Sequence, residues 1–156
     1  MSNLLKLIIS IALCLMAGAV GSYFTADAIP GWYETLNKPE FNPPNWVFGP
    51  VWTILYILMG ISLFLVWKEG PGNTKVKPAM LMFWVQLALN VLWSVVFFGM
   101  TNISGGLLVI ILLWISILIT ILRFRKISAV AGTLLVPYIL WVTFASVLNF
   151  FFYRLN

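Results

Sequence analysis

Histidine is absent from this chain of 156 residues, and cysteine occurs once, as Cys14 inside an apolar run. A zinc site built from cysteine and histidine needs several such ligands, and a hydrolase triad needs an imidazole, so both kinds of site are excluded. A single cysteine also excludes a disulfide within the chain. We therefore expect neither a metal site nor a cofactor.

Charge is almost as scarce. Charged residues make up 8% of the chain and hydrophobic residues 62%, and the mean hydropathy is +1.04. A soluble domain of this length needs a charged surface, which this composition cannot provide, so the solvent of the chain must be lipid. The net charge of +5 comes from a few basic residues between apolar runs, which favours membrane topology over nucleic-acid binding.

Acidic residues are also too few and too poorly placed for general acid–base catalysis. Three of the four fall in one segment between apolar runs and the fourth follows a run, so no two carboxylates share an apolar pocket that would tune their pKa values. These acidic residues are Asp27, Glu34, Glu40 and Glu69.

Five apolar runs are each long enough to cross a bilayer core, which takes about 20 residues in a helix. The sequence therefore predicts an all-α integral membrane protein, in which one domain over residues 1–156 forms a bundle of five transmembrane helices. The predicted helices cover residues 7–26, 47–67, 79–99, 103–122 and 129–152.

Basic residues are distributed unequally between the two ends of these helices. Cytoplasmic loops are enriched in lysine and arginine, so the side with more of them is predicted to lie inside. This places the N-terminus inside and the C-terminus outside, in what we expect to be a prokaryotic cell membrane. Lys38 and Arg154 then lie outside, and the inner side carries Lys6, Lys68, Lys75, Lys77, Arg123, Arg125 and Lys126.

The first connection, residues 27–46, differs from a plain connector because it holds four prolines and several aromatic residues. Proline stiffens a chain, and aromatic side chains can pack against the helices below. One interpretation is an interfacial rim, where tryptophan and tyrosine are common. The interpretation that we favour is a structured lid over the bundle, with Trp32, Lys38, Pro43 and Pro44 among its residues.

Polar residues recur on one face of two predicted helices. Gln86, Asn90 and Ser94 repeat every four residues in the third run, with Trp93 beside them. Polar groups within a membrane either bond to neighbouring helices or line a site. For Gln86 and Ser94, and for Asn149 in the fifth run, we favour interhelical hydrogen bonding. Asn90 together with Trp93 and Trp141 indicates a site.

The fifth run carries a similar face. It holds Tyr138, Trp141, Ala145 and Asn149, and Pro137 is expected to bend the helix. Together with Trp52 in the outer half of the second run, these residues lie at a depth beneath the first connection. Aromatic walls, few polar groups and a lid indicate a pocket for a large, planar, apolar ligand.

Three blocks of the sequence resemble the translocator protein family, whose bacterial members are called TspO or tryptophan-rich sensory proteins and whose animal members were called peripheral-type benzodiazepine receptors. The blocks follow the family order over nearly the whole chain. They are Trp32-Tyr33-x-x-Leu36-x-Lys38-Pro39-x-Phe41-x-Pro43-Pro44-x-Trp46-Val47-Phe48-Gly49-Pro50-Val51-Trp52-x-x-Leu55-Tyr56, Gln86-Leu87-Ala88-Leu89-Asn90-x-x-Trp93 and Pro137-Tyr138-x-x-Trp141-x-x-Phe144-Ala145-x-x-Leu148-Asn149.

The resemblance implies a five-helix bundle, often a homodimer, that binds porphyrins such as protoporphyrin IX and related hydrophobic ligands beneath the first loop. Some family members are reported to degrade protoporphyrin in light with the help of pocket tryptophans, which match Trp52 and Trp141. The pocket residues that the resemblance implies are Tyr33, Trp52, Asn90, Trp93, Trp141, Ala145 and Leu148.

One departure concerns sterols. Animal members carry a cholesterol-recognition pattern centred on a tyrosine near the end of the fifth helix, where this chain has Phe150. The nearby Tyr153 is followed directly by Arg154, without the residue that the pattern places between them. Such patterns are weak even when they are complete, so we do not expect this chain to bind cholesterol.

Three functions are therefore compared. The first is a tetrapyrrole sensor, scavenger or carrier, in which Asn90 bonds a polar edge of the ligand and the propionates lie near Lys38. Without histidine to ligate iron, we expect such a site to prefer the metal-free macrocycle to haem. The second is an enzyme that degrades porphyrin with light and oxygen through Trp52 and Trp141. The third is a small-molecule transporter, which is the least favoured because no charged residue lies within a span.

Overall fold

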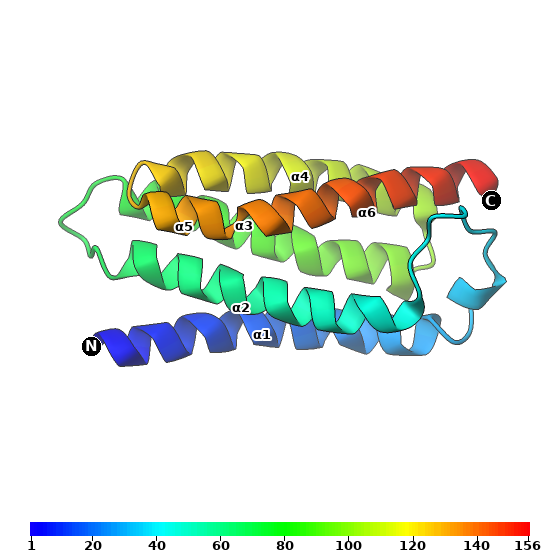
Figure 1. Ribbon diagram of the computed structural model, residues 1–156, viewed down its shortest axis with the longest axis horizontal. Helices are drawn as coiled ribbons and strands as arrows, with labels where there is room; N and C mark the ends of the chain where they lie inside the picture. Colours follow the sequence, from blue (N-terminus) through cyan, green and yellow to red (C-terminus); the bar gives the residue numbers. More distant parts are fainter.

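A computed structural model describes residues 1–156, and its regular structure is helical throughout (Figure 1). Five stretches are long and apolar enough to cross a membrane, which confirms the prediction of an all-α protein with five spans. They run from Asn3 to Ala28, Asn45 to Trp67, Val76 to Gly99, Ile103 to Arg125 and Ala129 to Leu155. The helices within them are α1 (Asn3–Ala28), α2 (Phe48–Trp67), α3 (Val76–Ser94), α4 (Ile103–Arg125), α5 (Ala129–Leu134) and α6 (Val136–Leu155).

Short polar side chains begin three of these helices. A side-chain oxygen accepts a hydrogen bond from a backbone N–H of the first turn, which has no partner within the helix. Ser2 does this for α1, Asn102 for α4 and Ser128 for α5. These caps fix the residues at which the three helices begin.

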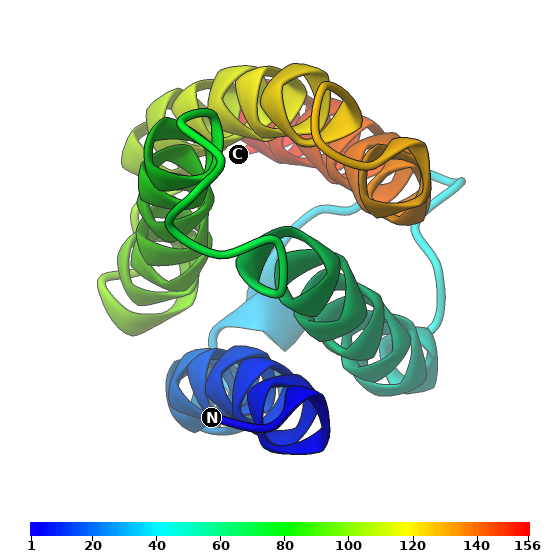
Figure 2. The same ribbon diagram turned by 90° about the vertical axis from the view of Figure 1, so that its left-hand side faces the viewer.

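The helices lie side by side along the long axis, with the two termini at opposite ends (Figure 1). Viewed from one end, they follow the order α1, α2, α5 with α6, α4 and α3 around the bundle (Figure 2). α1 packs on α2 and α3, and α4 packs on α3 and α6. α2 packs closely on α5, whereas the backbones of α2 and α6 lie farther apart and the two helices meet through aromatic side chains. This separation leaves room between α2 and α6 at the end that the first connection covers.

Two spans are irregular. The third ends in a π-turn over Val95–Gly99, and the fifth is interrupted at Leu135, between α5 and α6. Pro137 has no N–H to donate to the carbonyl of Thr133 one turn earlier, so a continuous helix would lose that bond and meet a steric clash. The sequence predicted a bend at Pro137, and the structure has a break just before it.

The core consists of one large apolar cluster and one small cluster. The large one fills the bundle and includes the parallel pair Phe83 and Phe124, whose ring centres lie 5.8 Å apart. The small one joins the first connection to the helices below it and consists of Tyr33 from the connection with Phe97, Leu148 and Phe152.

The outer faces of the helices remain apolar. Leu108, Ile111 and Leu140 are among many large hydrophobic side chains that stay exposed on the bundle. A soluble protein would not leave so many apolar side chains in water, so these faces contact lipid. The protein is a multi-pass membrane protein.

Candidate functional site

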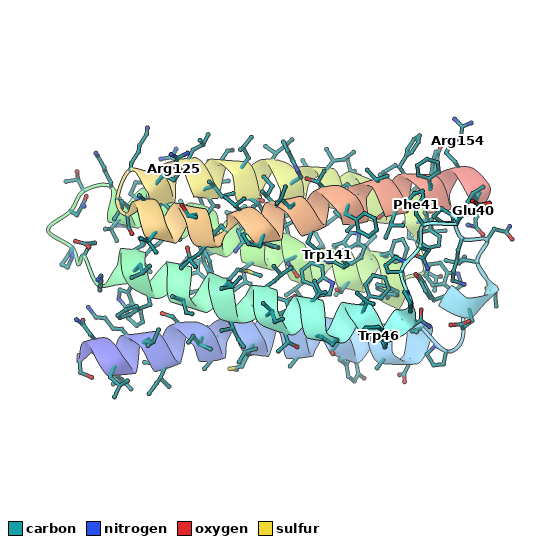
Figure 3. All side chains as sticks on the ribbon, viewed as in Figure 1. Glu40, Phe41, Trp46, Arg125, Trp141 and Arg154 are labelled. Atoms are coloured by element: carbon teal, nitrogen blue, oxygen red, sulfur yellow. The ribbon has the colours of Figure 1, made fainter.

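A cavity of about 480 Å³ lies between the helices, beneath the first connection. It occupies the region in which α2 diverges from α6, and Phe48 of α2 reaches across to Trp141 of α6, with 6.1 Å between ring centres. Trp141 lies near the middle of the molecule, between α6 and α2 (Figure 3). α1, α2, α3 and α6 all contribute side chains to its walls.

Small residues of α1 create space for one wall. Gly18 faces Tyr56, and a Cβ atom at Gly18 would lie only 2.6 Å from the tyrosine ring. Gly21 faces Ser94 in the same way. A Cβ atom at Gly21 would lie 3.1 Å from the serine hydroxyl oxygen. These glycines therefore serve contacts within the chain, and Ala19 and Ser22 continue the same wall.

Aromatic rings form the other walls. Trp52 stacks on Tyr56 with ring centres 5.7 Å apart, and Trp93 stacks on Phe97 at 5.2 Å. The π-turn has a further consequence, because Phe97 and its neighbour Phe98 both line the cavity. Consecutive side chains of a regular α-helix point in directions about 100° apart, so a wider turn helps both rings to face one space.

Asn90 lies in a chain of buried hydrogen bonds at one end of the cavity. The Tyr56 hydroxyl donates to Asn90 Oδ1 at 2.7 Å, and Asn90 Nδ2 donates to the Tyr138 hydroxyl at 2.7 Å. The Tyr138 hydroxyl in turn donates to Gln86 Oε1 at 2.7 Å. Asn90 therefore keeps one amide N–H that neither of these bonds uses, while the two bonds hold its side chain in place.

A second amide holds the opposite part of the wall. Asn149 Oδ1 accepts from the indole N–H of Trp93 at 3.0 Å, and Asn149 Nδ2 donates to the carbonyl of Ile103 at 3.0 Å. The indole N–H of Trp141, by contrast, is buried and has no partner. Buried donors are nearly always paired in proteins, so this N–H is available to an acceptor that reaches it.

The first connection covers the cavity with Tyr33, which is almost fully buried. Its hydroxyl donates to Asn42 Oδ1 at 3.2 Å within the connection, and burial raises the pKa of Tyr33. Lys38 does not reach the cavity. Its ammonium lies 5.0 Å from the centre of the Tyr33 ring and donates to the carbonyls of Glu34 and Leu36, at 3.5 and 3.4 Å.

The same connection is fastened to the end of α6. Phe41 packs against Phe151 of α6, with ring centres 5.3 Å apart, and Phe41 lies at the same end of the bundle as Arg154 (Figure 3). Asn37 and Asn156 exchange two hydrogen bonds of 3.0 Å, and the Asn37 side chain also donates to the carbonyl of Leu155 at 3.2 Å. We call these three bonds the Asn37–Asn156 latch.

The structure gathers all the predicted pocket residues around this one cavity. No aspartate, glutamate, lysine or arginine is among the lining residues. The predicted residues that line it are Tyr33, Trp52, Asn90, Trp93, Trp141, Ala145 and Leu148. Their role in ligand binding remains a prediction.

The four residues assigned to a lid lie elsewhere in the connection. Trp32 packs edge-on against Phe97, with ring centres 5.6 Å apart, and neither it nor Lys38, Pro43 or Pro44 lines the cavity. These residues shape the connection, whose own contributions to the cavity wall include Tyr33 and Asn45.

Several lining residues were not singled out from the sequence. Phe48 and Tyr56 belong to the first of the three blocks that resemble the family, but no role in the pocket was predicted for them. Each lies four residues from Trp52, which places all three on one face of α2. Phe97 follows Trp93 by four residues and Phe152 follows Leu148 by four, so the same spacing could have indicated both. Phe98 had no comparable signal, because it lies beside Phe97 in the π-turn.

Trp114 has a role in packing between helices. Its indole N–H donates to Thr143 Oγ1 at 2.8 Å, which ties α4 to α6. It does not line the cavity.

Comparison with known proteins places the chain among membrane proteins of one family. The model of the TspO/MBR family matches residues 10–154. The chain is 48% identical over 155 residues to the tryptophan-rich protein TspO of Archaeoglobus fulgidus, which covers 99% of both chains. It is 40% identical over 147 residues to the tryptophan-rich sensory protein of Cereibacter sphaeroides, covering 94% of this chain and 88% of that one. It is 38% identical over 138 residues to the human translocator protein, covering 88% and 82%.

Proposed function

This chain belongs to the TspO/MBR family, and we propose that it binds porphyrins such as protoporphyrin IX, as a tetrapyrrole sensor, scavenger or carrier. The observation that carries this proposal is the convergence of the seven predicted pocket residues on one cavity of about 480 Å³. That volume lies within the range of about 300–1,000 Å³ typical of small-molecule sites.

The chemistry of the walls suits a flat, apolar ring system. The Trp52–Tyr56 and Trp93–Phe97 stacks offer aromatic faces, and stacking adds to the energy of burying apolar area. Because no charged side chain lines the cavity, burying a carboxylate there would be costly. The propionates of a porphyrin would therefore lie at the outer end, where Lys38 is the cation of the connection.

Titration of the purified protein with protoporphyrin IX and with haem, followed by intrinsic tryptophan fluorescence, tests this proposal. Saturable quenching is expected, with tighter binding of the metal-free macrocycle because the chain has no histidine to ligate iron. Tighter binding of haem would contradict the preference, and absence of saturable quenching would contradict the proposal itself.

A pair of variants on α6 locates the site. Ala145→Phe adds a ring to a buried position in the cavity wall, and Val147→Phe adds the same ring to an exposed position on the same helix. We expect protoporphyrin binding to be lost in Ala145→Phe and retained in Val147→Phe. Equal affinity of both variants would place the ligand elsewhere.

A second candidate function is degradation of the bound porphyrin with light and oxygen. The observation that favours it is that Trp52 and Trp141 both line the cavity, since tryptophan oxidation requires no acid or base. The double change of Trp52→Phe and Trp141→Phe should then abolish loss of porphyrin absorbance under illumination while most of the binding remains. Parallel loss of binding and of photochemistry would reduce the effect to binding alone.

We also propose that the N-terminus lies inside a prokaryotic cell membrane and the C-terminus outside, and that the protein forms a homodimer. The excess of basic residues at one end supports the orientation, and Arg125 and Arg154 mark opposite ends of the bundle (Figure 3). The dimer is supported by the family resemblance. Covalent cross-linking in native membranes would trap a species of twice the 17.6 kDa chain mass, and its absence would contradict the dimer.

A further inference from the structure

The buried hydrogen bonds at one end of the cavity form a chain with a direction. Tyr56 donates to Asn90, Asn90 donates to Tyr138, and Tyr138 donates to Gln86, each over 2.7 Å. The four residues come from α2, α3 and α6, and none is more than 7% exposed. Only Tyr56 and Asn90 line the cavity, so Tyr138 and Gln86 lie behind them.

The direction of this chain depends on the residue at its far end. Gln86 Nε2 lies 3.9 Å from the thioether sulfur of Met59, which can accept a hydrogen bond but cannot donate one. If every bond were reversed, Gln86 would point its carbonyl oxygen at this sulfur, and the bond between them would be lost. The observed direction keeps the three bonds from Tyr56 to Gln86 and the bond from Gln86 to Met59. Each tyrosine hydroxyl can donate only one hydrogen bond.

This direction determines what Tyr56 can offer to a ligand. Its only proton is committed to Asn90 Oδ1, so any hydrogen bond that Tyr56 makes with a molecule in the cavity must use a lone pair of its oxygen. In the reversed chain, Asn90 would donate to Tyr56 and the tyrosine proton would be free to point into the cavity.

We propose that Met59, Gln86 and Tyr138 act as positioning residues that make Tyr56 a hydrogen-bond acceptor, and that the cavity thereby selects planar aromatic ligands with a pyrrole-type N–H at their edge. This inference rests on the proposed function, because it takes the cavity to be the ligand site. A closed porphyrin carries its N–H groups at the centre of the ring, so the selection applies to ligands, or parts of ligands, that present a pyrrole edge.

Carbazole and N-methylcarbazole test the selection. Both are planar tricyclic pyrroles, and they differ in the presence of the N–H. A hydrogen bond between neutral groups is worth a factor of about 3–10 in affinity, so carbazole should bind the wild-type protein tighter by that factor. Binding is measured in detergent by quenching of tryptophan fluorescence. Equal affinities, tighter binding of N-methylcarbazole, or absence of saturable binding by carbazole would overturn the proposal.

Tyr56→Phe separates the hydrogen bond from the bulk of the extra methyl group. This variant removes the acceptor and keeps the ring that stacks on Trp52, so the two ligands should bind with a ratio of about 1. A ratio that stays at the wild-type value would show that the methyl group acts by its size, and would overturn the proposal.

Met59→Leu tests the remote end of the chain. Leucine nearly conserves the volume of methionine but cannot accept a hydrogen bond, so both directions of the chain become available. We expect the ratio between the two ligands to fall toward 1 while N-methylcarbazole keeps its affinity to within about twofold. Met80→Leu is the matched control, because Met80 is partly buried and takes no part in these hydrogen bonds. It should keep the wild-type ratio between the two ligands.

A merely structural role for Met59 would weaken both ligands together and leave their ratio unchanged, which would contradict its role in positioning. Protoporphyrin titration of the same samples distinguishes failure of the Tyr56 proposal from failure of the proposed porphyrin binding. If porphyrin still binds and the ratio fails to respond, the inference about Tyr56 is wrong and the proposed function stands. If porphyrin and both carbazoles all fail to bind, the proposed function is wrong as well.

Discussion

Gly18 shows how a single residue determines the shape of the cavity. Its missing side chain allows the Tyr56 ring to lie against α1, and a Cβ atom there would meet three ring carbons at 2.6 to 3.3 Å. The same ring carries the hydroxyl that bonds Asn90. A shift of α1 against the Tyr56 ring would therefore also move the hydroxyl that holds the Asn90 amide.

Gly18→Ala is expected to push the Tyr56 ring away, and overpacking of this kind lowers the free energy of unfolding by about 1–3 kcal/mol. Protoporphyrin affinity should fall with it, because the ring and Asn90 both line the cavity. Gly49→Ala is the control, since Gly49 also lines the cavity but its added Cβ would meet nothing within 4 Å. Thermal unfolding and tryptophan quenching would measure both effects, and equal behaviour of the two variants would contradict this account.

Among the elements, the first connection closes a gap that the helices leave open. α2 and α6 diverge toward this end, and the connection joins α2 directly while it packs on α6 through Phe41. The Asn37–Asn156 latch adds three hydrogen bonds between residues that are 118 or 119 positions apart in sequence. The connection is therefore held at both sides of the gap.

Asn156→Ala removes two of the three bonds of the latch. Exposed hydrogen bonds contribute toward the lower end of about 0.5–1.5 kcal/mol each, so ligand release should become about 2- to 10-fold faster. Stopped-flow dilution of the porphyrin complex would measure the rate. Arg154→Ala is the control because this side chain is exposed near the same end of α6 and takes no part in the latch. An unchanged release rate in Asn156→Ala would mean that the latch does not limit opening.

For the whole molecule, the odd number of spans places the two termini on opposite sides of the membrane (Figure 1). The basic residues support the proposal that the end with Lys77 and Arg125 is the inner one, since they are concentrated there and are rare near Glu40. Labelling one residue at each end of the bundle would therefore show which end lies inside.

Two single-cysteine variants in a Cys14→Ser background measure the orientation. Glu40→Cys and Lys77→Cys both place a thiol at an exposed position, one in the first connection and one at the start of α3. A maleimide that cannot cross membranes should label Glu40→Cys in intact cells and label Lys77→Cys only after permeabilisation. The opposite labelling pattern would reverse the proposed topology.

Much of this fold follows from the sequence, because a bilayer constrains it strongly. Backbone groups cannot stay unpaired in lipid, so long apolar runs must be helices, and their number follows from counting them. The predicted runs and the observed spans differ by only a few residues at their ends, as in 103–122 against Ile103–Arg125. Seven residues that line the cavity were also predicted from side-chain spacing, depth and the family motifs, whereas others such as Phe48 and Phe98 were not.

Tertiary structure determined the parts that depend on contacts between distant segments. Lys38 faces the Tyr33 ring and backbone carbonyls rather than the cavity, because the connection folds on itself. The π-turn points Phe97 and Phe98 into one space, and no periodicity of the sequence indicates such a turn. The direction of the hydrogen-bond chain from Tyr56 depends on Met59 of α2 lying beside Gln86 of α3. Hydropathy and local spacing describe one helix at a time, whereas these features arise only where separate segments meet.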